Sequence, residues 1–368
     1  MKLKYWTLFF LALVLCACSN DDGNEPEFTP PKNINFKVVG QDLERVYLFS
    51  FNGNEDNSAT TDLSEELGIS LGFLTLRQNN DVLSFYSFSE GFFSLATKDV
   101  NTGAVMNYDN FFFNTSERSI TWGIDNTEQV VFGYFGPDGA RNLNLLDFGL
   151  DSSTEQDIPI EFNVDNTSQP LLFDNRVYIT YRDNLSNNKL TYYDIETGSL
   201  GPEISSTESI SYLITSIGEL AIVKTQPENR IELFDSESFT FLERISTNRS
   251  FAFQAGPIVN ATLIDNRLYF NEILPQPSQF LSTPAVFDLI NQDTNFVDIG
   301  GVVDAVELEL NETVFPTISL YDPGQDVFFM AYGLLNNQTS GGVLVISGEG
   351  EILEIVELPF LPTFILRN

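Results

Sequence analysis

The chain has 368 residues, no histidine, and 52 Asp and Glu residues against 18 Lys and Arg residues, which gives a net charge of -34 at pH 7. This charge would repel nucleic-acid phosphates, so we exclude nucleic acid as a partner. The absence of histidine excludes a Ser-His-Asp or Cys-His catalytic relay, and because both cysteines, Cys16 and Cys18, lie in the first 18 residues, the rest of the chain has no disulfide framework.

Residues 1–17 predict a secretory signal peptide. Two lysines precede an apolar run that ends at Leu15 and is too short to span a bilayer. The sequence Leu15-Cys16-Ala17-Cys18 then resembles the lipobox of bacterial lipoproteins, in which the invariant cysteine is acylated. The resemblance implies that Cys18 is lipidated, since Cys16 has no small residue directly before it. The alternative is an ordinary secreted protein with two incidental cysteines.

Residues 18–33 predict a flexible tether, because they are polar and acidic and contain Pro26, Pro30 and Pro31. Acidic residues directly after the lipidated cysteine resemble the export signal of Bacteroidota surface lipoproteins. This resemblance implies a protein anchored to the outer membrane by its lipid, on the cell surface rather than on the periplasmic face.

Residues 34–368 predict an all-β domain. The segment shows short alternating or aromatic runs bounded by Asn, Asp, Gly and Ser, and almost no sustained helical spacing of apolar residues. The one predicted helix is the short segment 62–67, which has acidic residues near its start and Gly68 after its end.

One β unit recurs along this domain. Its first recognisable strand occurs seven times, at residues 44–51, 80–88, 128–135, 175–181, 218–224, 266–273 and 325–333. A partner strand follows in six copies and leads into a turn at Asp99, Asp147, Asp194, Asp235, Asp288 and Ser347. Successive turns lie between 41 residues (Asp194 to Asp235) and 59 residues (Asp288 to Ser347) apart.

Such a repeat predicts a β-propeller, in which each blade is a small antiparallel sheet that cannot bury its faces alone. We favour seven blades, with the C-terminal run 363–366 completing the first blade and closing the ring. Six blades with an N-terminal extension is the alternative, and a two-sheet sandwich fits the repeated turn less well. The 33 Phe and 13 Tyr residues then fill the layers between blades, and Phe111, Phe112 and Phe113 are expected there.

Propellers place functional residues in the loops of one face, so the loop after each repeated strand is where we expect a ligand site. Phe135 leads into one such loop, and Arg141 and Arg182 lie in or beside two of them. The proline-rich excursion 272–284 is the longest and carries Phe280 near its tip. These four residues are the candidate ligand-binding residues. The alternatives are that the arginines only form ion pairs and that Phe280 folds back onto its own blade.

No cofactor is identified from the sequence. The cluster at residues 54–57, Asn-Glu-Asp-Asn, could supply oxygen ligands to calcium, but it lacks the spaced acidic motif and the closing Glu of a calcium loop. The glycine pairs 300–301 and 341–342 are interpreted as turns rather than phosphate loops.

The lipobox, the acidic tether and the repeat together resemble the propeller lipoproteins that Bacteroidota display beside nutrient importers. The resemblance implies a surface-exposed binding protein that captures a small ligand, a glycan or a protein partner, some members being associated with an outer-membrane transporter. Two alternatives remain open from the sequence. They are a carboxylate-dependent carbohydrate-active hydrolase or lyase, and a structural component of a surface assembly.

Overall fold

The computed structural model of the protein describes residues 34–53, 57–137, 141–337 and 339–367. The predicted signal peptide, the tether and Cys18 lie outside these ranges, and so do residues 54–56 of the candidate calcium cluster. Within the described ranges, no helix has the length and apolar character needed to cross a membrane.

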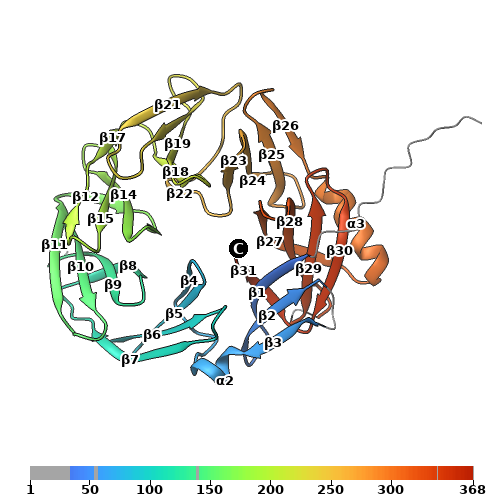
Figure 1. Ribbon diagram of the computed structural model, residues 1–368, viewed down its shortest axis with the longest axis horizontal. Coiled ribbons are helices and arrows are strands. Elements are labelled where there is room, and N and C mark those ends of the chain that lie inside the picture. Colours follow the sequence, from blue (N-terminus) through green and yellow to red (C-terminus); the bar gives the residue numbers. More distant parts are fainter. Residues whose placement is uncertain (1–33, 54–56, 138–140, 338, 368) are drawn as a thin grey trace, which may run out of the picture. The chain divides into compact units, whose positions relative to one another are not determined.

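Seven antiparallel sheets stand in a ring and form a seven-bladed β-propeller, numbered here as blades 1 to 7 (Figure 1). From the inner to the outer strand, blade 1 contains β31 (Leu361–Ile365), β1 (Asn35–Gln41), β2 (Val46–Asn52) and β3 (Ala59–Asp62). Blade 2 contains β4 (Thr75–Asn79), β5 (Val82–Ser89), β6 (Phe92–Asp99) and β7 (Val105–Phe113). Blade 3 contains β8 (Ser119–Asp125), β9 (Gln129–Phe135), β10 (Leu143–Gly149) and β11 (Glu155–Glu161).

The other four blades follow the same order, with local breaks. In blade 4 the inner and outer strands are each split, giving β12 (Val164–Thr167), β13 (Leu171–Phe173), β14 (Arg176–Asp183), β15 (Asn188–Asp194), β16 (Ser199–Leu200) and β17 (Ile204–Ser206). Blade 5 contains β18 (Ser211–Ile214), β19 (Leu220–Lys224), β20 (Arg230–Phe234), β21 (Phe241–Ser246) and β22 (Gly256–Pro257), which runs parallel to β18. Blade 6 contains β23 (Thr262–Ile264), β24 (Arg267–Ile273), β25 (Ser282–Asp288) and β26 (Asp293–Phe296). Blade 7 contains β27 (Val314–Asp322), β28 (Val327–Leu334), β29 (Gly341–Ser347) and β30 (Ile352–Leu358).

The C-terminal strand closes the ring. β31 pairs antiparallel with β1, with Val38 opposite Ile365 and Val39 opposite Phe364, and so supplies the inner strand of the blade that begins the domain. The seven-blade prediction and the predicted closure are therefore confirmed, and the six-blade alternative is wrong. One alignment is also corrected. Segment 44–51 contains β2, the third strand of its blade, whereas the other six copies correspond to second strands, because β31 takes the first position in blade 1.

The two helices of the described residues lie in connections between blades. The predicted short helix is present as α2 (Leu63–Leu67), with Asp62 accepting a hydrogen bond from the Glu65 amide and Gly68 ending it at φ 69°. The second helix, α3 (Ile299–Leu310), was not predicted and joins blades 6 and 7. The glycine pair 300–301, interpreted as a turn, is in fact its first turn, which Asp298 caps by accepting from the Gly301 amide.

The second glycine pair also lies in regular structure rather than in a turn. Gly341 and Gly342 begin β29, in the middle of blade 7. A Cβ atom on Gly341 would collide with the carbonyl oxygen of Tyr332, so glycine is required by the close approach of the backbone.

The repeated aspartates shape the hairpins between third and fourth strands. Asp99, Asp235 and Asp288 each accept hydrogen bonds from backbone amides two or three residues ahead, and these bonds hold the pKa of all three carboxyls below the usual value. The assignment of Asp147 to this position is wrong. Asp147 lies inside β10, where its buried carboxylate accepts from the Tyr193 hydroxyl at 2.6 Å, and Gly149 occupies the turn position instead.

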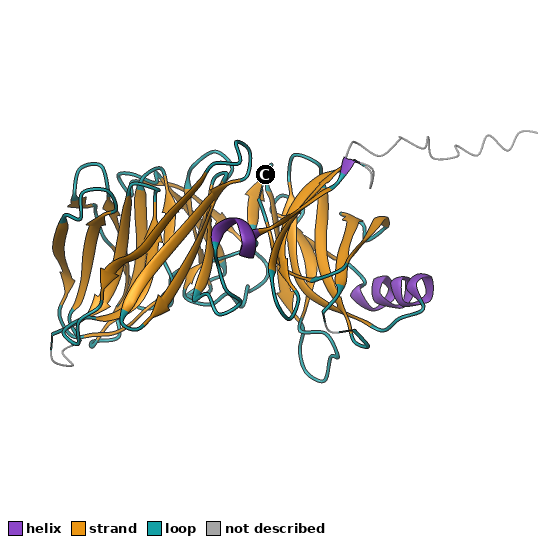
Figure 2. Ribbon diagram, turned by 90° about the horizontal axis from the view of Figure 1, so that it is seen from below, coloured by secondary structure: helices purple, strands orange, loops and turns teal. Residues whose placement is uncertain are grey.

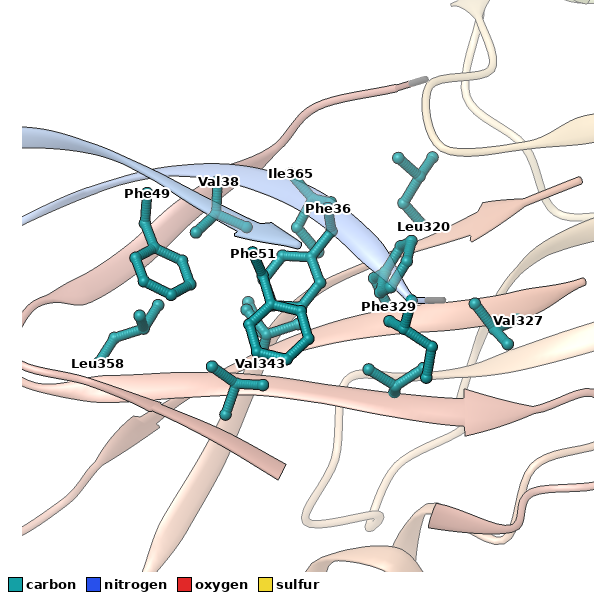
Figure 3. Close-up of a cluster of buried hydrophobic side chains, with 14 of the residues drawn as sticks. Phe36, Val38, Phe49, Phe51, Leu320, Val327, Phe329, Val343, Leu358 and Ile365 are labelled. Carbon is teal, nitrogen blue, oxygen red and sulfur yellow. The ribbon is translucent and has the colours of Figure 1, made fainter. Parts of the chain in front are cut away.

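Side chains from neighbouring blades form the core. Figure 3 shows the layer between blades 7 and 1, where the Phe36 ring lies 5.0 Å from the Phe51 ring and 5.2 Å from the Phe329 ring, measured between centroids. Val38 and Ile365, paired across the closing strands, lie in the same layer. Burying one such side chain contributes about 1.5–3 kcal/mol, so each blade is stabilised chiefly by its neighbours.

The aromatic run Phe111–Phe113, at the end of blade 2, only partly follows the prediction. Phe111 and Phe112 pack in the layer between blades 2 and 3, as expected. Phe113 does not, because it is the last residue of β7, remains 53% exposed and contacts the Phe92 ring.

The alternation of antiparallel strands gives the ring two different faces, which Figure 2 presents edge-on. The loop face carries the connections between second and third strands and between successive blades. The turn face carries the remaining hairpins, including those shaped by Asp99, Asp235 and Asp288. Since β1 is a second strand, it runs toward the loop face, and Ile34 therefore enters the domain at the turn face.

We predict that replacing Ile365 with Ala lowers the free energy of unfolding by about 3 kcal/mol, because it leaves a void in the layer that joins the first and last blades. Urea unfolding measures this value. Thr363→Ala is the matched control, since Thr363 lies on the same strand and is exposed. Equal losses for both variants would contradict closure through β31.

Candidate functional site

A cavity of about 770 Å³ opens on the loop face between blades 6 and 7. Its lining comes from the long connection between β24 and β25, from the start of β27 and from one side of α3. The connection between these two blades is a 12-residue helix, whereas most other blades are joined by short coil. This helix is the feature that sets blades 6 and 7 apart from the rest of the ring.

Phe280 is the predicted site residue that lines this cavity. The loop that carries it is closed at its base by a hydrogen bond from the Leu274 amide to the Leu281 carbonyl, at 2.9 Å. The Phe280 ring is half-buried and packs against the core cluster that contains Val303 of α3. The ring therefore packs in the layer between two blades rather than only onto its own blade, while Leu281 beside it is 82% exposed.

The polar part of the lining is neutral or acidic. The Asn271 side-chain amide donates to the Ser319 carbonyl at 3.1 Å, and the Ser319 hydroxyl donates to the Asn271 side-chain oxygen, so these groups hold each other. Glu307 accepts from the Val314 amide at 3.0 Å and ties α3 to β27, whereas Asp304 is exposed. None of the described lining residues is a lysine or arginine.

Arg141 and Arg182 lie together, but in a different part of the ring. Arg141 donates to one oxygen of Asp165 at 2.8 Å, and Arg182 lies 3.5 Å from the other oxygen. Arg141 is 68% exposed, so this small ion-pair group stands on the surface of blades 3 and 4. Phe135, at the end of β9, packs against the core between the same blades. The four candidate residues thus do not form one site.

Several cavity residues were missed by sequence reasoning, and they belong to the missed helix. Val303, Asp304 and Glu307 line the cavity from α3. The signal that could have found the helix was the capping residue Asp298, followed by apolar residues on one side at Val302, Val303 and Val306.

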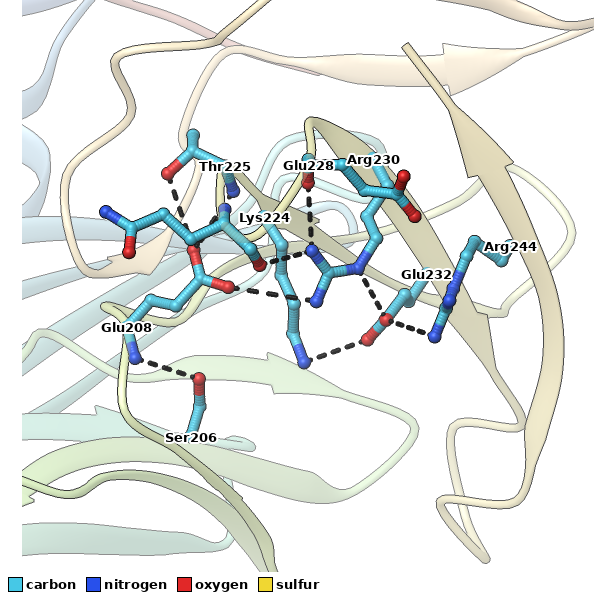
Figure 4. Close-up of polar contacts among 9 residues, drawn as sticks. Ser206, Glu208, Lys224, Thr225, Glu228, Arg230, Glu232 and Arg244 are labelled. Carbon is cyan, nitrogen blue, oxygen red and sulfur yellow. Dashed lines mark hydrogen bonds and ion pairs between the residues drawn. The ribbon is translucent and has the colours of Figure 1, made fainter.

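A buried charged group lies in blade 5 (Figure 4). Glu232, with a side chain only 6% exposed, pairs with Arg230 and Lys224 at 2.8 Å each and with Arg244 at 3.3 Å. The pKa of Glu232 stays below the usual value because these cations outweigh the effect of burial. Arg230 also donates to the carbonyls of Gln226 and Glu228, so the group fixes the loop between β19 and β20.

A second hollow, of about 470 Å³, lies between blades 6 and 7 on the turn face. The Tyr269 and Tyr321 rings stack there with centroids 3.4 Å apart. The Tyr321 hydroxyl donates to Asp326 at 2.7 Å, and Arg267 lies 3.9 Å from Asp288, so the polar groups are mostly satisfied internally. As for metals, no three acidic or cysteine side chains of the described residues converge as ligands.

Comparison with known proteins gives distant structural similarities and no family. No protein-family model and no curated protein matches the chain. Among solved structures, it is similar to a dihydro-heme d1 dehydrogenase, NirN, in complex with DHE, at 12% identity and a TM-score of 0.45, over 92% of this chain and 76% of that one. It is also similar to a prolyl endopeptidase, at 11% identity and a TM-score of 0.48, over 79% of this chain and 43% of that one. A third is the WD40 domain of Toxoplasma gondii coronin, at 10% identity and a TM-score of 0.41, over 91% of this chain and 75% of that one.

These proteins have different functions, and the propeller assignment rests on the seven sheets themselves. The propeller fold suits a binding or scaffold role, and fold alone does not decide between them.

The two ion-pair groups give a prediction about stability. Glu232→Gln is expected to lower the free energy of unfolding by about 3 kcal/mol, because three cations then lose their buried partner. Asp165→Asn is the matched control and is expected to cost less than about 1 kcal/mol, since its arginines are exposed to water. Urea unfolding of both variants tests this, and similar losses would contradict it.

Proposed function

We propose that this protein is a lipid-anchored binding protein of the cell surface, which captures a small ligand, a glycan or a segment of a protein in the cavity between blades 6 and 7. The observation that carries the proposal is the cavity of about 770 Å³ on the loop face, a volume within the usual range for ligand sites. A neighbouring outer-membrane transporter is the partner to which such a ligand would pass.

The chemistry of the lining supports binding of a neutral or cationic molecule. Apolar groups such as Phe280 and Phe315 offer contact area, and the exposed Gln279 side chain offers hydrogen bonds. Asp304 and Glu307 would favour a positive charge over a negative one. A hydrolase role is less well supported, because Glu307 is engaged by the Val314 amide and Asp304 is exposed.

The distribution of apolar side chains also supports the loop face as the binding face. Eight of the exposed large apolar side chains lie in its connections, and two, Ile217 and Ile290, lie in turn-face hairpins. The eight are Leu43, Leu74, Phe162, Leu185, Val259, Leu281, Leu308 and Leu335. The described domain begins with Ile34 at the turn face, opposite the loop face.

A thermal-shift screen with glycans, cobalamin and siderophores tests the cavity. A true ligand at about 100 times its dissociation constant stabilises the protein by about 2.7 kcal/mol, or roughly 4 °C in Tm. Gln279→Trp should abolish the shift, because the exposed Gln279 lines the cavity and a large ring there fills it. Leu185→Trp, on the same face in blade 4, should not. No shift with any compound, or an unchanged shift in Gln279→Trp, would refute the cavity as the site.

The anchor has its own test in cells. Cys18→Ala is expected to move the protein from the membrane pellet to the soluble fraction, whereas Cys16→Ala, two residues away, should leave it in the pellet. Protease treatment of intact cells should degrade the wild-type protein if it is displayed on the surface. Release by Cys16→Ala, or retention of Cys18→Ala in the pellet, would rule out lipidation at Cys18.

A further inference from the structure

Almost every cation in the described part of the chain has an acidic partner. Three of the 18 Lys and Arg residues, Lys2, Lys4 and Lys32, lie outside the described residues, which leaves 15. Twelve of these 15 form an ion pair with a carboxylate of a described residue. The other three are Lys37, Arg77 and Arg367. In a chain with 52 acidic residues, a guanidinium without an acidic partner is unexpected.

Two of these three, Arg77 and Arg367, belong to the innermost strands of adjacent blades. Arg77 lies in β4 of blade 2, and Arg367 follows β31 of blade 1. The Arg367 amide donates to the Gln78 side chain at 2.9 Å, and the Gln78 side chain donates back to the Arg367 carbonyl at 2.8 Å. These two bonds hold the inner strands of the two blades together, and Figure 1 has the C-terminal end of the chain at the middle of the ring.

The Arg367 guanidinium has neither a hydrogen bond nor an ion pair with any described residue. The Arg367 side chain is exposed, and surrounding protein lowers its pKa by desolvation with no carboxylate opposing this effect. Because Arg367 directly follows the innermost strand of blade 1, its side chain starts from the inner edge of the ring.

Arg77 makes its hydrogen bonds to neutral acceptors. Its Nε donates to the Gly123 carbonyl at 2.5 Å, and an Nη donates to the Gln169 side chain at 2.6 Å, so the guanidinium reaches toward blades 3 and 4. Asp125 acts on it electrostatically, but no oxygen of Asp125 forms an ion pair with it. The oxygens of Asp125 accept from the hydroxyls of Tyr86, at 2.5 Å, and Ser84, at 2.9 Å.

From this geometry we propose that the axis of the ring, beside the inner strands of blades 1 and 2, binds a small oxyanion. Carboxylate or phosphate oxygens match the planar fork of the Arg367 guanidinium, and Arg77 adds a second positive charge from the next blade. At 0.15 M salt, charges more than about 8 Å apart are largely screened. The binding of an anion therefore depends on the groups next to it rather than on the net charge of the chain. The site is distinct from the cavity of the proposed function, whose lining residues all belong to residues 260–330.

Titration of the purified protein with inorganic phosphate and, separately, with citrate tests the proposal, in about 0.15 M NaCl by calorimetry and thermal unfolding. We expect at least one of these anions to bind with a dissociation constant below about 1 mM. Arg367→Gln should weaken this binding at least about 10-fold, and Arg367→Lys should weaken it less, because the charge remains but the paired donors are lost. The control Arg141→Gln should bind as the wild type does, since Arg141 is an exposed arginine paired with Asp165.

Comparison of the two anions tells a phosphate site from a carboxylate site. Failure of both to bind, or unchanged binding by Arg367→Gln, would overturn the proposal. A third contrary result would be a marked loss of stability of Arg367→Gln in anion-free buffer. That loss would mean that the guanidinium already has an anionic partner within the chain. None of these outcomes depends on Gln279, so the oxyanion site and the cavity are tested independently.

Discussion

The pairing of β31 with β1 is the contact on which the whole ring depends. Each blade buries its two faces against its neighbours, and blade 1 would have no inner strand without the C-terminal segment. Closure therefore completes both a sheet and the layer that contains Phe36, Phe329 and Ile365. It also positions Arg367, whose backbone amide donates a hydrogen bond to Gln78 in the neighbouring inner strand.

The turn face of the ring is similar from blade to blade, whereas the loop face differs. Four turn-face hairpins share one feature, an aspartate whose carboxylate accepts from amides of its own turn, at Asp99, Asp194, Asp235 and Asp288. Because this feature recurs in four of the seven blades, we assign it to the scaffold. The loop face varies from blade to blade, and its largest departure is α3, one side of which lines the cavity between blades 6 and 7. Specific binding is therefore expected where the repeat is broken.

Sequence patterns predicted the parts of the fold that depend on local chemistry. Alternation of apolar residues and the recurring turns were enough for seven blades, and the run 363–366 was enough for closure. The helix α3 was not predicted because Gly300, Gly301 and several valines are poor helix formers. Its stability comes instead from packing of Val302, Val303 and Val306 on the blades. The meeting of Arg141 and Arg182 at Asp165 could not be predicted either, since it depends on how two blades pack.

The ion pairs of the structure distinguish structural cations from candidate binding residues, which the sequence alone could not do. Arg141 and Arg182 attracted attention because cations are few, yet both are paired with Asp165. In the same way, Arg230 is fully used by Glu232 and two carbonyls. A cation with a structural role can be recognised by its carboxylate and carbonyl partners. In a chain so rich in carboxylates, most cations are expected to have such a partner. Arg367 lacks one among the described residues, and it follows the innermost strand of blade 1, which is why we propose an anionic ligand rather than a structural role for it.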